Sequence, residues 1–153
     1  MKKEYMDIAF EEAKIAFDND EVPIGVVIVK DDKIIAKAHN NKNSDNLVTS
    51  HAEIIAIEQA ERQLNNWRLD GCDIYITLEP CIMCSGAIIQ SRIKTIYYGA
   101  YDEKGGALGT SIDVLTAENI NHHPEVHGGI MKEECSTLLT NYFKKKRKMK
   151  LGL

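Results

Sequence analysis

The ten residues 77–86 constrain the fold more than any other stretch, because a strand, a turn and two cysteines follow one another there. The stretch reads TLEPCIMCSG. The β-branched and aromatic residues at 74–78 favour a β-strand, and Pro80 suits the first turn of a helix, where its missing N–H is not needed. The stretch therefore predicts a strand that leads into a helix start bearing Cys81 and Cys84.

The two thiols lie one helical turn apart at this helix start. The unpaired N–H groups and the positive dipole end there favour a thiolate, which is the form of cysteine that binds metal. A C-x-x-C pair alone has three interpretations: half of a zinc site, a redox pair, or two core cysteines. The choice between them depends on the rest of the chain.

A second helix start lies upstream, at the run Ser50-His51-Ala52-Glu53. In one interpretation this run is a capping box, with Ser50 as N-cap and Glu53 reaching back to its N–H. In the other, His51 supplies an imidazole and Glu53 carries protons beside a metal. The 27 residues between Glu53 and Cys81 leave room for one helix and one strand, so the two helix starts can meet at one sheet edge. H-x-E followed by P-C-x-x-C resembles the zinc deaminase signature, whose Glu is not a ligand, and this favours the second interpretation.

Length and composition set further bounds. A chain of 153 residues suits one domain, here 1–153, which can bury roughly 68–70% of its unfolded surface. No apolar run approaches the ~20 residues of a membrane span, and acidic residues precede the first apolar segment, so we expect a mature cytoplasmic protein that binds no membrane. We expect Cys72 and Cys135 to be small core residues and not a disulfide pair.

Charge is distributed unevenly along the chain. The net charge of −4 argues against a surface that binds nucleic acid everywhere. Residues 144–150 nevertheless hold six of the 19 cations and no acid: Lys144, Lys145, Lys146, Arg147, Lys148 and Lys150. This basic tail has two interpretations, a solvated helix end whose cations suit the helix dipole or a segment that contacts phosphates.

The hydrophobic pattern predicts an α/β domain. Apolar residues at helical spacing predict a helix at 5–17, and two apolar runs predict antiparallel strands at 22–29 and 34–38. Later elements alternate between helix and strand, which implies parallel strands joined by crossovers. They are a helix at 51–64, a strand ending at 78, a helix from 81 to about 91, a strand at 94–98, a helical turn at 111–115, a short fifth strand at Val126 and a terminal helix at 131–146.

Two loops and one aromatic residue complete the pattern. The asparagine-rich segment 39–46 predicts a loop that leads to His51, and the loop at 99–106 should emerge at the same sheet edge as the cysteines, since it follows a parallel strand. Asn40 can be read as a turn former or as a hydrogen-bonding contact for a substrate. Trp67, the only tryptophan, is predicted to be a packing anchor.

Beyond these motifs the chain resembles the bacterial tRNA-specific adenosine deaminases of the cytidine deaminase fold. The resemblance covers most of the chain, in matching order and spacing. It rests on the metal signature and on the runs EVPIG at 21–25, NWRL at 66–69, TLEPCIMC at 77–84, SRI at 91–93, GAYD at 99–102 and ECSTLL at 134–139. It implies a three-layer α/β/α fold with a central mixed five-stranded sheet, and a homodimer.

The resemblance also implies an activity, hydrolytic deamination of adenosine to inosine at the wobble position of a tRNA anticodon, with arginine tRNA as the expected substrate. Its partner is the anticodon stem-loop, which makes a phosphate-contacting role for the basic tail the favoured interpretation. The implied cofactor is one Zn²⁺ per subunit, bound by His51, Cys81 and Cys84. Glu53 is the implied proton carrier, so Glu53→Ala should keep zinc and lose turnover. The implied substrate contacts are Asn40, Asp102 and, with Asn121, His122.

Two rival functions share part of this pattern. A deaminase of free bases or nucleotides, of the cytidine or guanine type, would carry the same metal motifs. A binding module would instead hold a structural zinc closed by a fourth protein ligand such as His39 or His122, whereas a catalytic zinc keeps its fourth position open.

Overall fold

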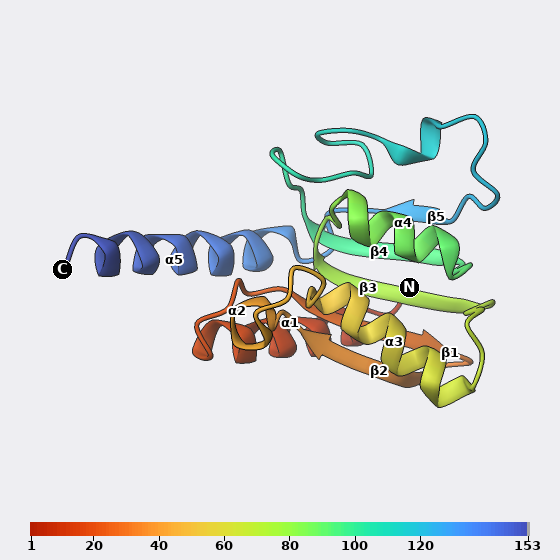
Figure 1. Cartoon of the computed structure of the whole chain (residues 1–153), viewed down its shortest axis with the longest axis horizontal. Coiled ribbons are helices and arrows are strands. Elements are labelled where there is room, and N and C mark those ends of the chain that lie inside the picture. The colour runs from red at the N-terminus through yellow and green to blue at the C-terminus, as the bar shows by residue number, and fades with distance from the viewer. Residues whose placement is uncertain (153) are drawn as a thin grey trace.

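The computed structural model describes residues 1–152, so the last residue of the predicted 1–153 domain, position 153, lies outside the described residues. Among residues 1–152, every helix is too short or too polar to traverse a lipid bilayer. The elements follow one another along the chain (Figure 1) as α1 (Lys3–Asp18), β1 (Gly25–Lys30), β2 (Lys33–His39), α2 (Lys42–Asp45), α3 (Ala52–Leu64), β3 (Cys72–Leu78), α4 (Ile82–Gln90), β4 (Thr95–Ala100), the 3₁₀ helix η1 (Val114–Thr116), β5 (Glu125–His127) and α5 (Lys132–Lys150).

The strands form one mixed five-stranded sheet in the order β2-β1-β3-β4-β5, as predicted. β1 pairs antiparallel with both β2 and β3, whereas β3, β4 and β5 run parallel to one another. Leu78 pairs with Ala100, so β3 and β4 end side by side. The segments that follow these two strands therefore leave the sheet at the same edge.

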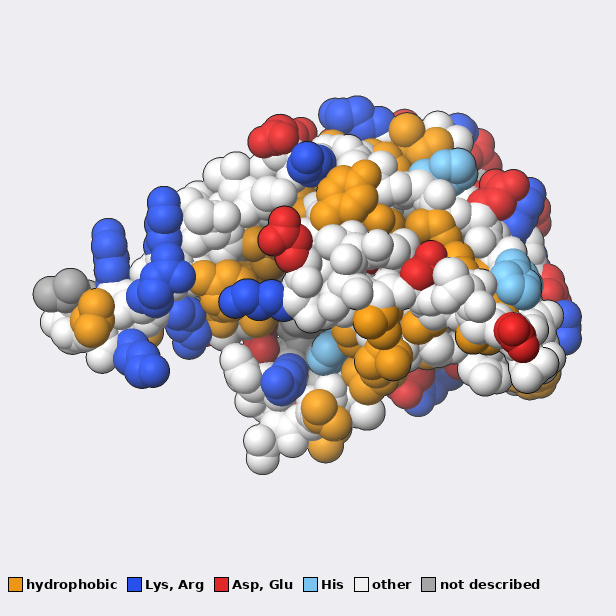
Figure 2. Space-filling model, turned by 90° about the horizontal axis from the view of Figure 1, so that it is seen from above, with side chains coloured by type: hydrophobic (Ala, Val, Ile, Leu, Met, Phe, Trp, Pro, Cys, Tyr) orange, Lys and Arg blue, Asp and Glu red, His pale blue; other side chains and the backbone are white. Residues whose placement is uncertain are grey.

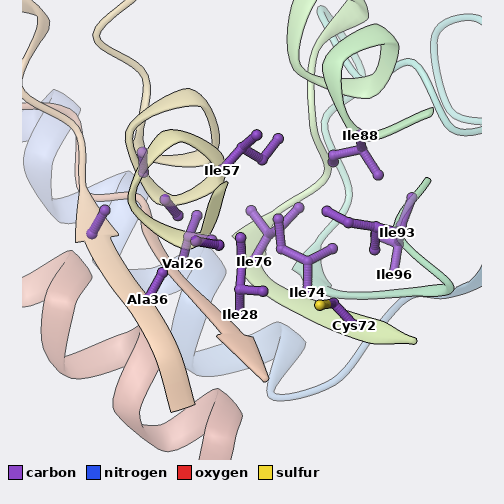
Figure 3. Close-up of a cluster of buried hydrophobic side chains, with 14 of the residues drawn as sticks. Val26, Ile28, Ala36, Ile57, Cys72, Ile74, Ile76, Ile88, Ile93 and Ile96 are labelled. Atoms are coloured by element: carbon purple, nitrogen blue, oxygen red, sulfur yellow. The ribbon is translucent and has the colours of Figure 1, made fainter. Parts of the chain in front are cut away.

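Helices cover both faces of the sheet, and successive residues of a strand pack against different helices because side chains alternate between the two faces. Ile28, Ile74 and Ile76 point toward α3 and α4 in the larger core cluster (Figure 3). Val27 and Tyr75, one residue away along the same strands, pack instead against α1. α5 contacts β4 and α1 on that second face and extends beyond the sheet (Figure 1). The predicted three-layer α/β/α arrangement is confirmed.

Several predicted boundaries are wrong by a few residues. The first strand begins at Gly25 and not at 22, because residues 22–24 form a tight turn in which the N–H of Ile24 donates to the carbonyl oxygen of Val22 at 2.8 Å. A Cβ on Gly25 would lie 1.9 Å from the carbonyl oxygen of Ala9, so only glycine lets α1 lie so close. The predicted loop 39–46 contains the short helix α2. The predicted helical turn at 111–115 is η1, slightly later, and α5 continues past 146. Pro80 precedes the N-cap Cys81 and is not inside the helix.

The prediction that Trp67 is a packing anchor is wrong. Its side chain is 57% exposed and lies beside the guanidinium groups of Arg68 and Arg92. Leu69, two residues later, is fully buried in the larger core cluster. The Leu69 N–H also donates a 2.7 Å hydrogen bond to the carbonyl oxygen of Ser91. The anchor that follows α3 is therefore Leu69, because Trp67 lies outside the core.

We expect Leu69→Ala to lower the free energy of unfolding by about 2–5 kcal/mol, the range for leucine truncation in a packed core. Trp67→Ala should change it by less than about 1 kcal/mol, since substitutions at exposed sites have small effects. Urea denaturation followed by circular dichroism measures both values. Equal losses in the two variants would contradict this assignment of the anchor.

Candidate metal and active site

The starts of α3 and α4 bring together the three predicted metal ligands. His51 is the N-cap residue of α3, and Cys81 is the N-cap residue of α4. The Nδ1 atom of His51 lies 3.8 Å from the Sγ of Cys81 and 3.6 Å from the Sγ of Cys84. The three ligand atoms all lie within 4.8 Å of one another. Two helix starts more than 25 residues apart in the sequence thus form one cluster, which we call the His/Cys/Cys group.

The His/Cys/Cys group could hold a metal ion with one position left over. One imidazole and two thiols are a ligand set that suits tetrahedral zinc. Within residues 1–152 the group includes no fourth His, Cys, Asp or Glu. The two candidates for a closing ligand have other partners: His39 Nδ1 lies 3.1 Å from Glu12 Oε1, and His122 Nε2 lies 2.6 Å from the carbonyl oxygen of Ile93.

The two thiols of the group differ in acidity. A hydrogen bond from the Cys84 thiol lowers the pKa of Cys81 to about 5, with smaller contributions from backbone N–H groups at the start of α4 and from His51. The same hydrogen bond and burial raise the pKa of Cys84. Cys81 is therefore the more readily deprotonated of the two thiols, and a bound metal would deprotonate Cys84 as well.

Glu53 lies beside the group with an unsatisfied carboxyl. The side chain is buried, and Oε1 has no hydrogen-bond partner. Burial raises the pKa of Glu53 to about 7, the charge of Cys81 acts in the same direction, and a hydrogen bond with Cys84 opposes the shift. A buried carboxyl oxygen without a partner is costly unless a ligand or ordered solvent completes it. The residues present thus fit a metal site, with the unpaired oxygen of Glu53 beside the Cys84 ligand.

The capping-box interpretation of this helix start is wrong. Ser50 is not the N-cap, and its hydroxyl donates a 2.8 Å hydrogen bond to Oδ2 of Asp45. The N–H of Ala52 donates instead to Oδ1 of Asn40, at 2.8 Å. The N–H of Ser50, which a capping box would pair with Glu53, donates to the carbonyl oxygen of Leu47 at 3.1 Å.

A pocket of about 780 Å³ opens beside His51. Its lining comes from the segment before β1, the end of β3, the loops after β2 and β4, and α5. The lining residues are Val22, Ile24, Asn40, Lys42, His51, Leu78, Tyr101, Asp102, Lys104, Leu139, Phe143, Lys146, Arg147 and Lys150. Of the predicted substrate contacts, Asn40 and Asp102 therefore lie in one pocket with a predicted metal ligand.

The pocket is strongly basic although the whole chain is acidic. Five cations and a single carboxylate line it, whereas the net charge of the chain is −4. Lys and Arg side chains gather on the protruding end of α5 (Figure 2). Sequence reasoning identified the cations of the basic tail but missed Lys42 and Lys104. Both lie in the two loops predicted to reach this edge, so their loop positions were the available signal.

His122 lies at the opposite edge of the sheet. Its contact with Ile93 places it before the start of β4, whereas Cys81 follows the end of the parallel strand β3. The sheet thus separates His122 from the His/Cys/Cys group of the same chain. His122 does not line this pocket, and a contact between His122 and an RNA substrate stays a prediction.

Comparison with known proteins agrees with this geometry. Residues 1–147 match the model of the MafB19-like deaminase family. The chain is 44% identical over 146 residues to a tRNA-specific adenosine deaminase of Bacillus subtilis (strain 168). The aligned region covers 95% of this chain and 91% of the relative.

Solved structures show the same fold. One, from a study of A-to-I editing by tRNA:A34 deaminases at the wobble position of transfer RNA, superposes with a TM-score of 0.86 at 42% identity. It covers 90% of this chain and all of its own. A guanine deaminase from Nitrosomonas europaea shares the fold at 23% identity, with a TM-score of 0.78 over 93% of this chain and 84% of its own.

Proposed function

We propose a function for this chain from one premise: the chain belongs to the family of tRNA-specific adenosine deaminases. It deaminates adenosine in tRNA to inosine, depends on one zinc ion per subunit, and acts at the wobble position of the arginine tRNA anticodon. The B. subtilis relative is named for tRNA adenosine deamination, and the similar structure comes from work on the wobble position.

The positive charge of the pocket is the observation that supports tRNA as the substrate. A free base or nucleoside carries no phosphate and would gain little from five cations around the opening. An RNA strand presents one phosphate per nucleotide, and lysine and arginine contacts to phosphates supply most of its sequence-independent affinity. The pocket therefore favours a nucleotide within RNA over the free-base alternative.

His51, Cys81 and Cys84 would hold the zinc ion, which when bound activates water for attack on the base. Glu53 is the proton carrier. Its carboxylate accepts a proton from the attacking water and delivers it to N1 of adenine as the oxygen bonds to C6. It then takes the proton of the new C6 hydroxyl and passes it to the amine, so that the bond from C6 to the amine breaks, ammonia leaves and the C6 carbonyl of inosine remains. Burial keeps the pKa of Glu53 near 7, which suits a group that must both accept and donate protons at neutral pH.

Two polar residues position the nucleoside. The Asn40 oxygen is occupied by the N–H of Ala52, so its amide N–H groups are the donors available to a base in the pocket. One oxygen of Asp102 accepts the N–H groups of Lys104 and Gly105, both at 3.1 Å. The other Asp102 oxygen is left to accept from a ribose hydroxyl.

The direct test is to incubate the zinc-loaded protein with an unmodified arginine tRNA transcript and to sequence the wobble position. We expect inosine there, and no product from free adenosine, cytidine or guanine. Rapid turnover of a free base with no change in the tRNA would show that the free-base alternative is correct.

We expect the apparent KM for an anticodon stem-loop to rise steeply with salt, with kcat nearly constant. Replacing the pocket-lining cations Arg147 and Lys150 by glutamine should raise KM and reduce the slope of log KM against log salt by about one for each lost phosphate contact. Steady-state assays at a series of salt concentrations from about 50 to about 300 mM measure KM and kcat.

The matched control lies on the same helix. Lys144 and Lys148 line a different hollow on α5 and not the pocket. Replacing both by glutamine therefore removes the same number of positive charges as the Arg147 and Lys150 replacements, but outside the pocket. If this control pair changed the salt slope as much as Arg147 and Lys150 do, charge on the whole helix and not the pocket would explain binding.

We also propose a homodimer, as the resemblance implies. Ile82 at the start of α4 is 62% exposed, and a second copy of the chain would cover such an apolar side chain. Sedimentation equilibrium measures this directly, and a monomer at micromolar concentration would refute it. A tRNA substrate implies that the protein works in the cytoplasm.

A further inference from the structure

Two buried glutamates outside the His/Cys/Cys group have no role in the proposed reaction. Glu21 and Glu79 are each 1% exposed, so both carboxylates are withdrawn from water. Within residues 1–152 neither takes part in a salt bridge. Each carboxylate accepts hydrogen bonds from backbone N–H groups instead, and for each the donors belong to one of the two loops that form the pocket.

Glu79 holds the loop that follows β4. Its Oε1 accepts the N–H of Asp102 at 3.2 Å, and its Oε2 accepts the N–H groups of Leu108 and Thr110 at 3.0 and 3.2 Å. Glu79 is two residues from Cys81 in the chain. The same side chain thus ties the wall containing Tyr101, Asp102 and Lys104 to the turn that carries the cysteines.

Gly106 shows how closely this loop wraps the carboxylate. A Cβ at position 106 would lie 2.5 Å from the Cδ atom of Glu79 and 2.6 Å from the carbonyl oxygen of Asp102. Any larger residue would therefore push the loop off the carboxylate. Backbone contact continues on the next residue, where the N–H of Ala107 donates to the carbonyl oxygen of Pro80 at 2.9 Å.

Glu21 holds the other wall in the same way. Its Oε1 accepts the N–H of Asn43 at 2.9 Å, and its Oε2 accepts the N–H and the hydroxyl of Ser44 at 2.7 and 2.8 Å. These donors belong to α2, between the pocket-lining residues Asn40 and Lys42 and the metal-ligand candidate His51. The buried Glu21 carboxylate thus accepts three hydrogen bonds from this loop, and these bonds fix the loop.

We infer that Glu21 and Glu79 are positioning residues, which hold the two walls of the pocket in the geometry that binds the nucleotide. This inference rests on the proposed function, because the walls carry the residues proposed to contact RNA. A carboxylate is needed at both positions, since it only accepts and both of its oxygens face N–H donors. A glutamine of the same shape would present its own N–H groups to some of these donors, and the wall would loosen.

The test uses Glu79→Gln and Glu21→Gln in the zinc-loaded full chain. We expect each variant to keep zinc, to raise KM for the anticodon stem-loop about tenfold and to change kcat less than threefold, because misplaced contacts in the walls weaken binding by about that much. Amide hydrogen exchange by NMR supplies a readout independent of activity. Glu79→Gln should speed exchange at Asp102, Leu108 and Thr110, and Glu21→Gln at residues 43 and 44.

The two variants control one another, since each should loosen its own wall and leave the other protected. Glu12→Gln is the matched control for a buried carboxylate, because Glu12 is 8% exposed and contacts His39, not a pocket wall. If Glu79→Gln does not fold, Gly106→Ala tests the same wall with the carboxylate in place, and we expect the same rise in KM. Unchanged exchange at the donor amides, or faster exchange with unchanged KM, would overturn the inference. A wild-type protein inactive on RNA would instead refute the proposed function, while the exchange data would still report on the walls.

Discussion

Replacing Glu53 by alanine should lower the rate of deamination by about 10²–10⁴-fold, the range that a positioned general acid–base supplies. Zinc content should remain at one ion per chain, because Glu53 is not a member of the His/Cys/Cys group. The variant should also fold at least as stably as the wild type. Oε1 of Glu53 is buried without a partner, so removing it relieves an unfavourable burial.

Single-turnover assays on the anticodon stem-loop, together with metal analysis and thermal denaturation, measure these three quantities. Glu58→Ala on the same helix is the control, since its side chain is exposed and should leave all three unchanged. Substantial deamination by Glu53→Ala would show that another group moves the protons. Loss of zinc in that variant would show that Glu53 is a ligand.

Replacing Cys84 by serine should remove both the metal and the activity. The Cys84 thiol is fully buried 3.6 Å from Nδ1 of His51, so no neighbouring side chain can take its place without a rearrangement. The free energy of unfolding should fall by about 3–4 kcal/mol at zinc concentrations of 100 to 1,000 times Kd, because the stabilising ligand is lost. Mass spectrometric metal analysis and urea denaturation measure the two effects.

Cys72→Ser is the matched control for this loss. Cys72 is also fully buried, but its nearest polar contact is the carbonyl oxygen of Asp70 at 3.9 Å, far from the His/Cys/Cys group. The same substitution there should leave zinc and turnover intact. If both variants kept one zinc ion per chain, the proposed ligand set would be wrong.

The fold and the His/Cys/Cys group could be predicted from the sequence because they depend on short-range patterns. Strand chemistry at 74–78 and the C-x-x-C spacing place Cys81 and Cys84 at a helix start. Parallel strand order then brings His51 to the same edge. The structure agrees, with the three ligand atoms within 4.8 Å of one another.

The errors arise where neighbours distant in sequence decide the outcome. Trp67 follows a helix as Leu69 does, but only the packing of β3 and α4 determines which of the two is buried. The S-x-x-E pattern at Ser50 is a valid capping signal that Asp45 and Asn40 override, since their side chains take the hydrogen bonds. The pocket itself depends on where α5 crosses the sheet edge, which local periodicity does not encode.

The positioning roles proposed for Glu21 and Glu79 were not predicted from the sequence, for a different reason. Both belong to the motif runs at 21–25 and 77–84, yet a buried glutamate that accepts only backbone N–H groups has no sequence pattern of its own. Its donors are defined by loop conformation, which depends on the tertiary structure.

The most direct test of the central claim is a crystal structure of the zinc-loaded protein, with the metal located by anomalous scattering. The account predicts one zinc ion per chain bound by Nδ1 of His51 and the sulfurs of Cys81 and Cys84, with a solvent molecule as fourth ligand within hydrogen-bonding distance of Glu53. A fourth protein side chain on the metal, or a Glu53 carboxyl turned away from it, would contradict the account.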